Sequence, residues 1–325
     1  MRNIMLRIVT AALLAVWSVI PAGAEDLPVI RAAVLKTGTV NWELSTIHRL
    51  GLDRAHGFAL EVLPFADNAA TQIAVAGGAA DVAVADWIWV ARQRAAGKPF
   101  VVIPYSRAVG SLVVAQDSAA RQLSDLAGGK IAIAGGPLDK SWLILRAYAA
   151  QTEGLDLKAA TEQVYGAPPL VYKTAVAGDY AGAINFWHFL AKMKAAGMRE
   201  LVSVAQAAEA LGLDPDVPLL GYYMSEELLR DHPDLAQALY DASRDAKDRL
   251  ASDESAWQAL RPQMNAASDA EFAQLRADWL AGTPARGPVD QAEAAKFLEL
   301  MGRLGGADLV GAASTLPEGL FVDVR

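Results

Sequence analysis

Hydrophobic and polar positions along the chain follow two periods in turn, which predicts short strands separated by helices. The stretch 74–103, AVAGGAADVAVADWIWVARQRAAGKPFVVI, shows the pattern. A helix ends at Gly77 and Gly78, an apolar strand follows over 81–85, and an amphipathic helix runs from Trp87 to Gly97. Helices that alternate with strands indicate a parallel sheet, in which ligands bind beyond the carboxyl ends of the strands.

The same order of elements returns about one hundred residues later, in 175–204. Ala175–Gly178 repeats Ala74–Gly77, Trp187 stands where Trp87 stood, and the second strand is one residue shorter. Chance similarity in an alanine-rich chain is one explanation. The other is a pair of similar α/β lobes, each presenting a strand end and an aromatic-led helix to a shared cleft. A solenoid is excluded because the unit does not recur a third time.

The remaining chain predicts further elements of both kinds. Strands are expected at 29–36, 58–64, 112–114, 131–134 and 218–224, and helices at 41–55, 69–76, 140–151, 234–250, 269–281 and 289–304. The glycine-rich segment 135–142 opens one of these helices and matches neither a Walker loop nor GxGxxG, so a nucleotide site is disfavoured. The tail 314–325 predicts no element.

Length and composition support two lobes, and the net charge argues against a nucleic-acid partner. A chain of 325 residues exceeds what one hydrophobic core usually fills, and 53% hydrophobic with 20% charged residues is typical of a well-buried α/β protein. The formal net charge of −8 gives no support for binding nucleic acid. We expect a monomer.

The N-terminus predicts export. Arg2 and Arg7 precede an apolar run over 8–20, and Ala22-Gly23-Ala24 is a typical cleavage site, so residues 1–24 are predicted to be a cleavable signal peptide. An uncleaved anchor is the alternative. The chain contains no cysteine, which excludes disulfides, a lipid-attachment cysteine and thiolate metal sites. A Gram-negative periplasm is the expected location.

Several motifs in fixed order resemble one family. They are the loop Gly38 to Trp42, the segment GFALEV at 57–62, the run AVAGGAADVAVAD at 74–86, and LSDLAGGKIAI at 123–133 followed by Gly135-Gly136-Pro137. Over about 29–250 the chain resembles the periplasmic substrate-binding proteins of ABC importers, of the nitrate/sulfonate/taurine type.

The resemblance implies a type II periplasmic-binding-protein fold, with two α/β lobes, a ligand cleft between them and two crossover strands. The crossings are expected near 113–117 and 219–223. Lobe 1 would then be discontinuous, comprising 25–114 and 222–325, and lobe 2 would be 115–221. Hinge closure would capture a solute for delivery to a permease and ATPase complex at the inner membrane.

Candidate ligand-binding residues are those that this fold places at strand ends or helix starts. They are Asn41, Trp42, Asp86, Trp87, Arg107, Lys140, Ser141, Asn185, Trp187 and His188. Each has a structural alternative: the tryptophans as packing against the sheets, Asp86 as a helix cap, the basic residues as surface charges, and His188 as a polar-face residue.

The ligand expected from these residues is a small organic solute. Arg107, Lys140 and Ser141 suit a sulfonate or carboxylate, whereas the aromatic residues suit an organic body and Asp86 suits an amine or a ring N–H. A periplasmic sensor or accessory binding protein of the same fold is the alternative function.

An enzyme is the less favoured alternative. Enzymes of this fold that make a thiamine precursor need a cysteine-rich iron motif, which the chain lacks, and no GxSxG motif occurs. The four histidines show no metal-ligand spacing. No catalytic residue, metal or cofactor is therefore expected.

Overall fold

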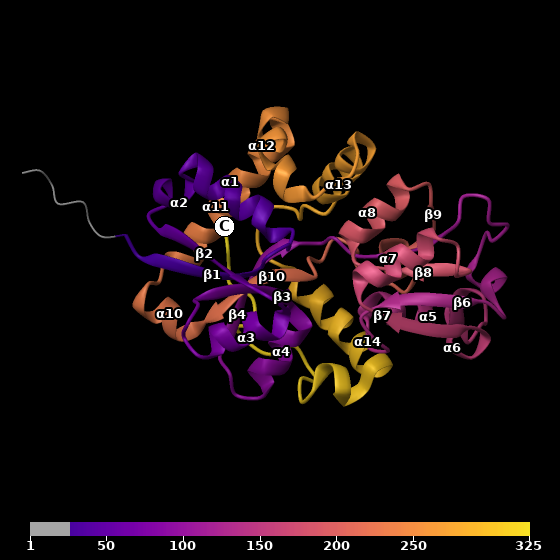
Figure 1. Cartoon of the computed structure of the whole chain (residues 1–325). Helices are drawn as coiled ribbons and strands as arrows, with labels where there is room; N and C mark the ends of the chain where they lie inside the picture. Colours follow the sequence, from indigo (N-terminus) through magenta and orange to yellow (C-terminus); the bar gives the residue numbers. More distant parts are fainter. Residues whose placement is uncertain (1–26) are drawn as a thin grey trace, which may run out of the picture.

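Residues 27–325 are described by the computed structural model. They form two five-stranded sheets, each flanked by helices, in two lobes that lie side by side (Figure 1). The predicted signal peptide, residues 1–24, lies outside the described residues. Within 27–325, no helix combines the length and the apolar character that crossing a membrane requires.

The sheet of the first lobe mixes parallel and antiparallel pairing. Its strands are, in spatial order, β2 (Ala59–Phe65), β1 (Val29–Leu35), β3 (Val82–Asp86), β10 (Leu220–Ser225) and β4 (Phe100–Ser106). β1 pairs in parallel with β2 and β3, whereas β10 runs antiparallel between β3 and β4. The carboxyl ends of β1, β2, β3 and β4 therefore share one edge of the sheet.

The sheet of the second lobe has the same plan. Its strands are, in spatial order, β7 (Glu162–Gly166), β6 (Lys130–Ala134), β8 (Gly182–Ile184), β5 (Ser111–Val114) and β9 (Arg199–Ser203). β5 takes the antiparallel place that β10 takes in the first sheet. The repeated sequence falls on equivalent elements, with β3 matching β8 and β4 matching β9. The prediction of two similar α/β lobes is confirmed.

Helices cover both sheets. Those packed in the second lobe are α5 (Lys140–Thr152), α6 (Leu157–Ala160), α7 (Pro168–Val176), α8 (Trp187–Ala195) and α9 (Val204–Ala210), with a 3₁₀ turn at Leu123–Leu126. The others are α1 (Val40–Leu50), α2 (Leu52–Ala55), α3 (Asn68–Ala76), α4 (Trp87–Ala95), α10 (Glu226–Asp231), α11 (Leu235–Ser252), α12 (Glu254–Met264), α13 (Asp269–Ala281) and α14 (Gln291–Val310). Side-chain caps fix several starts: Asp67, Asp86 and Asp139 each accept a backbone N–H in the first turn.

The positions of the two crossings differ from the prediction. The sequence placed residues up to 114 in lobe 1, but β5 pairs with β8 and β9, so the chain has already entered the second sheet at Ser111. The first crossing is the segment 107–110 between β4 and β5. The second crossing ends before Leu220, because β10 lies wholly in the first sheet.

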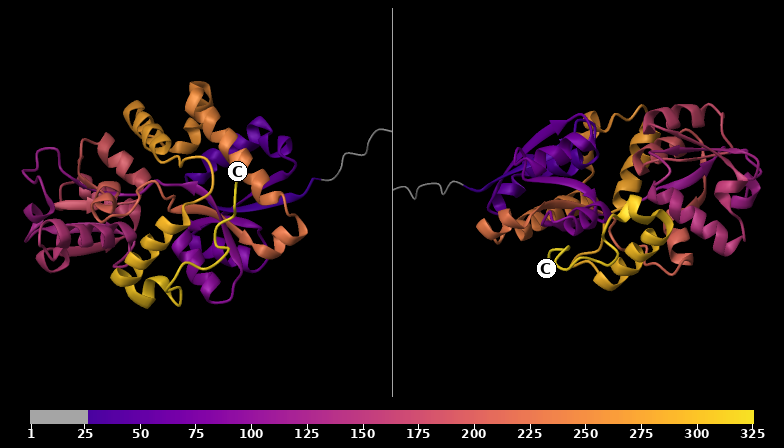
Figure 2. Two further views of the ribbon diagram at one scale, coloured as in Figure 1. Left: turned by 180° about the vertical axis from the view of Figure 1, so that it is seen from behind. Right: turned by 90° about the horizontal axis from the view of Figure 1, so that it is seen from below.

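The C-terminal helices contact both lobes. α13 packs along α8, and α14 lies between α4 of the first lobe and α5 of the second. Figure 2 shows α14, in yellow, at the junction of the lobes from behind and from below. The tail then adds to the open edge of β4, where the Val102 N–H donates to the Leu320 carbonyl at 2.7 Å and the Val322 N–H donates to the Val102 carbonyl at 2.9 Å.

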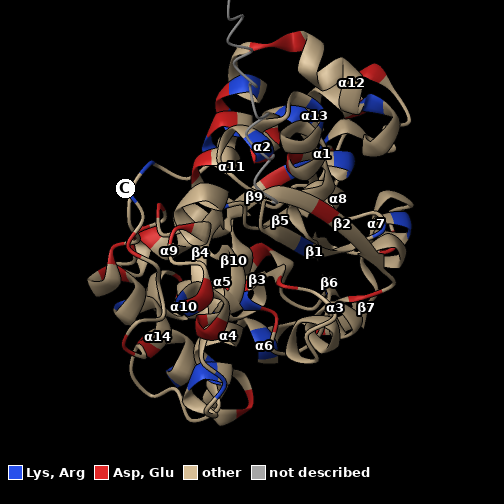
Figure 3. Cartoon of the chain, turned by 90° about the vertical axis from the view of Figure 1, so that its left-hand side faces the viewer, with Lys and Arg blue, Asp and Glu red and all other residues tan. Residues whose placement is uncertain are grey.

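Basic and acidic positions are interspersed along the helices and strands of the two lobes (Figure 3). Neither sign forms a continuous stripe in this view, unlike the basic surfaces that bind nucleic acid. Many of these charges are paired, as in the ion pair between Arg31 and Asp81 at 2.7 Å.

Candidate functional site

The first crossing runs past a strand end and a helix start of the second lobe. Gly110, in this crossing, has no room for a side chain, since a Cβ would lie 2.9 Å from the Asn185 carbonyl oxygen and 3.0 Å from Ser141 Oγ. Ser141 lies in the first turn of α5, and Asn185 follows β8. The crossing therefore runs directly against two of the predicted site residues.

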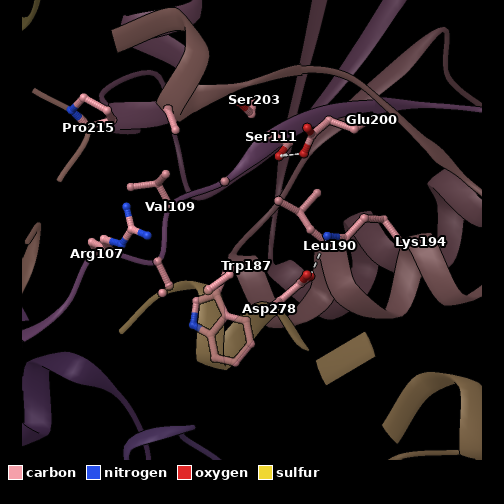
Figure 4. A pocket seen from close by; sticks show the side chains of 15 residues that line it. Arg107, Val109, Ser111, Trp187, Leu190, Lys194, Glu200, Ser203, Pro215 and Asp278 are labelled. Carbon is pink, nitrogen blue, oxygen red and sulfur yellow. Dashed lines mark hydrogen bonds and ion pairs between the residues drawn. The ribbon is translucent and has the colours of Figure 1, made fainter. Parts of the chain in front are cut away.

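A pocket of about 250 Å³ opens beside this crossing (Figure 4). We call it the hinge pocket. Its walls come from the crossing, from β5, β9, α8 and α9 of the second lobe, and from the end of α13. The lining residues are Arg107, Ala108, Val109, Gly110, Ser111, Trp187, Leu190, Lys194, Glu200, Ser203, Ala205, Pro215, Asp278, Ala281 and Gly282. Arg107 and Trp187, two predicted site residues, share this pocket. A change in the angle between the lobes would alter its shape.

Charged groups in the hinge pocket are already paired. Arg107 contacts Asp216, Lys194 Nζ lies 2.6 Å from an Asp278 carboxylate oxygen, and Ser111 Oγ donates to Glu200 at 2.5 Å. The Asp216 side chain is 66% exposed, whereas that of Asp278 is 20% exposed. The Arg107 pair is therefore the more strongly screened by solvent and the easier to exchange for a ligand group.

Trp187 joins the hinge pocket to a contact between the lobes. Its ring meets Trp42 of α1 edge-on, with centroids 5.8 Å apart, and Trp42 in turn meets Trp257 of α12 at 6.3 Å. Trp42 is 3% exposed, so it serves mainly as packing, while Trp187 is half-buried. Trp187 thus keeps part of its ring surface available to a solute.

Asp86 and Lys140 form an ion pair across the lobes. Asp86 ends β3, Lys140 begins α5, and Lys140 Nζ lies 3.0 Å from Asp86 Oδ2. Asp86 Oδ1 accepts the Trp89 N–H at 2.9 Å, so the carboxylate also caps α4. Burial raises the pKa of the neighbouring Asp139, and the Asp86 carboxylate raises it further. The pair therefore joins the end of β3 in the first lobe to the start of α5 in the second.

Three of the predicted site residues make their contacts within the protein. Trp87 has no exposed surface, packs edge-on against Phe297 and Phe321, and does not line the hinge pocket. Asn185 donates to the Pro168 carbonyl at 2.9 Å and accepts the Phe186 N–H at 2.8 Å. Asn41 donates to the Leu35 carbonyl at 2.8 Å. Both asparagines shape the backbone at strand ends.

His188 lies among aromatic rings next to the hinge pocket. Its ring centroid is 4.6 Å from that of Phe189 and 5.7 Å from that of Trp187. Burial, together with the charge of Lys192, lowers the pKa of His188 from 6.5 to about 4. The imidazole is therefore neutral at neutral pH and takes no part as a charged ligand group.

The sequence analysis missed Lys194, Glu200, Ser203 and Asp278. Helical spacing was an available signal for the first, because Leu190 and Lys194 follow Trp187 at three and seven residues and so share one face of α8. Asp278 has no such local signal, since it reaches the pocket only through the packing of α13 on α8. Within the described residues, no three His, Cys, Asp or Glu side chains are grouped as a metal site.

Residues 49–255 match the model of the family described as NMT1/THI5 like. The chain belongs to the NMT1/THI5-like family. The match spans both crossings and most of the lining of the hinge pocket. No curated protein sequence matches this NMT1/THI5-like chain.

Solved structures similar to this NMT1/THI5-like protein share its fold over nearly the whole chain. The periplasmic aliphatic sulphonate binding protein SsuA from Escherichia coli is 19% identical with a TM-score of 0.66, covering 90% of this chain and 95% of its own. The alkanesulfonate-binding protein SsuA from Xanthomonas axonopodis pv. citri is 20% identical with a TM-score of 0.65, covering 92% and 99%. An ABC transporter protein from Parabacteroides distasonis is 14% identical with a TM-score of 0.65, covering 91% and 99%. The predicted periplasmic-binding-protein fold is confirmed.

Proposed function

We propose that this protein binds a small organic solute between its lobes and delivers it to an ABC importer. The observation that carries the proposal is the hinge pocket, whose walls come from the crossing that joins the lobes, from the second lobe, and from α13, which contacts α11 and α12 on one side and α8 on the other. In such a pocket, solute binding and the angle between the lobes are coupled. The similar sulfonate-binding proteins of two bacteria support the same function.

The proposed solute carries an anionic group and an apolar or aromatic body. Arg107 supplies the guanidinium, which suits a sulfonate or carboxylate that replaces the exposed Asp216. Trp187 supplies an aromatic surface for the body of the solute. Lys140 and Ser141, at the start of α5, lie close to the same crossing and are proposed to contact the solute when the lobes move.

The proposed setting is the periplasm, with a permease and ATPase complex at the inner membrane as partner. The similar structures from Escherichia coli and Xanthomonas include a protein named as periplasmic and proteins named for sulfonate binding, not for catalysis. We accordingly assign no catalytic residue. Stimulation of the ATPase of its own permease complex in proteoliposomes, by the loaded protein and not the free one, tests this role.

A thermal-shift screen tests solute binding. We expect an organic sulfonate or carboxylate with an aromatic or branched body to raise the melting temperature, because a ligand at one hundred times its Kd adds about 2.7 kcal/mol of stability. For a protein of about 300 residues that is a shift of roughly 4 °C. A panel of sulfonates, carboxylates, amines and heteroaromatic acids in which nothing raises the melting temperature would overturn the proposal.

Matched variants locate the site. Arg107→Met should abolish the shift caused by anionic solutes and leave the melting temperature of the free protein nearly unchanged, because its pair with Asp216 is solvent-exposed. Arg303→Met is the control, since Arg303 pairs with Glu299 one helical turn away on α14. Equal losses of binding in the two variants would place the solute elsewhere.

A further inference from the structure

A polar network is buried inside the first lobe, remote from solvent. The Glu43 side chain is fully buried and that of Lys247 is 3% exposed. Glu43 Oε1 accepts the hydroxyls of Tyr222 at 2.9 Å and Ser243 at 2.6 Å, and Oε2 contacts Lys247 Nζ. Lys247 Nζ also donates to Ser243 Oγ at 2.7 Å. Both carboxylate oxygens are therefore satisfied within the protein.

Such a network is costly to bury. Among the ion pairs of residues 27–325, none has its two side chains less exposed than Glu43 and Lys247. Burial lowers the pKa of Lys247, which shows that desolvation opposes its charge even with the Glu43 carboxylate beside it. Apolar residues of similar volume often stabilise a fold at least as well as a buried ion pair. Stability alone is therefore a weak reason for the network, and fixing one defined geometry is the other role that a buried pair can have.

The network contacts the points where the chain leaves and re-enters the first lobe. Lys247 Nζ lies 4.8 Å from the ring centroid of Tyr105, and the rings of Tyr105 and Tyr222 meet edge-on at 5.0 Å. Tyr105 stands two residues before Arg107, at the start of the first crossing. Tyr222 stands two residues after Leu220, at the end of the second.

The same network also holds α1. Glu43 directly follows Trp42, and Trp42 contacts Trp187 of the second lobe. α11, which carries Ser243 and Lys247, packs against α1 and β4. A single carboxylate–ammonium pair thus links α1, β4, β10 and α11 at the base of both crossings.

We propose that Glu43 and Lys247 are positioning residues of the hinge. They fix the directions in which the two crossings leave the first lobe and the placement of α1, and so set the angle between the lobes. Through that angle they place Trp42 against Trp187 and Arg107 in the hinge pocket. The inference rests on the lobe motion in the proposed function, but it concerns the geometry of the protein without solute.

A distance measurement between the lobes tests the proposal. The chain has no native cysteine, so Ala55→Cys in the first lobe and Ala159→Cys in the second, both at exposed positions, take spin labels cleanly. In the solute-free protein, Lys247→Met should shift the mean distance or at least double the width of its distribution. Tyr222→Phe, which removes one hydroxyl, should cause a smaller change in the same direction.

Two further variants separate positioning from stability. Glu43→Gln combined with Lys247→Met leaves no lone buried charge, so the protein should regain thermal stability while the distance distribution stays altered. Arg94→Met is the matched control, because Arg94 pairs with Glu226 at 2.6 Å in the first lobe away from both crossings. It should lower stability without changing the distances.

Unchanged distances in the Lys247→Met and double variants would overturn the proposal. Equal changes in Arg94→Met at matched loss of stability would overturn it as well, since any weakening of the first lobe would then suffice. No solute enters these measurements. A failed solute screen and a failed positioning role are therefore distinguished.

Discussion

The polar side chains predicted at the cleft differ in whether their hydrogen-bonding groups are already bonded to other parts of the protein. The side-chain amides of Asn41 and Asn185 donate to backbone carbonyls. Arg107 instead pairs with Asp216, whose side chain is mostly exposed and can be replaced by a solute. The sequence predicted the location of all three, because strand ends follow from the hydrophobic pattern. It could not predict which of them the protein itself binds, because the carbonyls of Leu35 and Pro168 belong to other elements, β1 and α7.

His188 predicts acid sensitivity at the scale of one residue. The pKa of His188 is about 4 in the folded protein against 6.5 in the unfolded chain, so between these values the unfolded chain takes up a proton that the folded one does not. The stability is therefore complete above pH 6.5 and falls as the pH falls toward 4, by at most about 3 kcal/mol.

Urea unfolding at pH 7 and pH 4.5 measures this effect. His188→Gln should lose part of the difference between the two pH values, since the variant has no imidazole to protonate. His56→Gln is the control, because His56 lies against Asp245 on the opposite lobe. A pH dependence unaltered by His188→Gln would show that the ring is protonated equally in both states.

The two copies of the repeated sequence pattern are packed differently in the structure. β3 with α4 and β8 with α8 occupy the same places in their sheets, and the sequence echo predicted this correspondence. α14 and the C-terminal tail cover the start of α4, so Trp87 is enclosed by Phe297 and Phe321. The start of α8 is less completely covered: Trp42 meets the Trp187 ring edge-on, and Trp187 remains half-buried. The difference arises from a segment about two hundred residues distant, which local patterns do not reveal.

Alanine substitution should separate the two tryptophans. Trp87→Ala removes a fully buried ring from the core and should lower the free energy of unfolding by about 3–5 kcal/mol. Trp187→Ala should cost less than half as much and should abolish the thermal shift produced by a solute. Denaturant unfolding and the solute screen measure the two effects. Equal destabilisation by both substitutions would make Trp187 a core residue and would remove it from the proposed site.

At the scale of the whole molecule, the lobes are joined by more than their crossings. The sequence predicted two crossings but placed the first too late, because the apolar run at 112–114 has no feature that shows which sheet it joins. It also assigned the C-terminal helices to the first lobe alone. In the structure, a continuous apolar cluster includes Trp87, Phe297 of α14 and Trp142 of the second lobe. α14 therefore has to accommodate any change in the angle between the lobes.

The Asp86–Lys140 pair should favour the closed arrangement even without solute. It joins the two lobes at 3.0 Å, and its side chains are 20% and 24% exposed, so we expect a contribution of about 0.5–1 kcal/mol. Lys140→Met should therefore shift the equilibrium between lobe arrangements about two- to five-fold toward the open one. Salt at 1 M should act in the same direction on the unsubstituted protein, because it screens a partly exposed pair.

The spin-label pair at positions 55 and 159 measures this shift as a longer mean distance. Lys130→Met is the control, since Lys130 pairs with Glu162 at 3.2 Å within the second lobe and joins nothing across the cleft. If Lys140→Met and Lys130→Met give the same distances as the unsubstituted protein, the ion pair does not hold the lobes together. The angle would then depend on the packing of α13 along α8 and of α14 between α4 and α5, where every closing motion has to slide one helix against another.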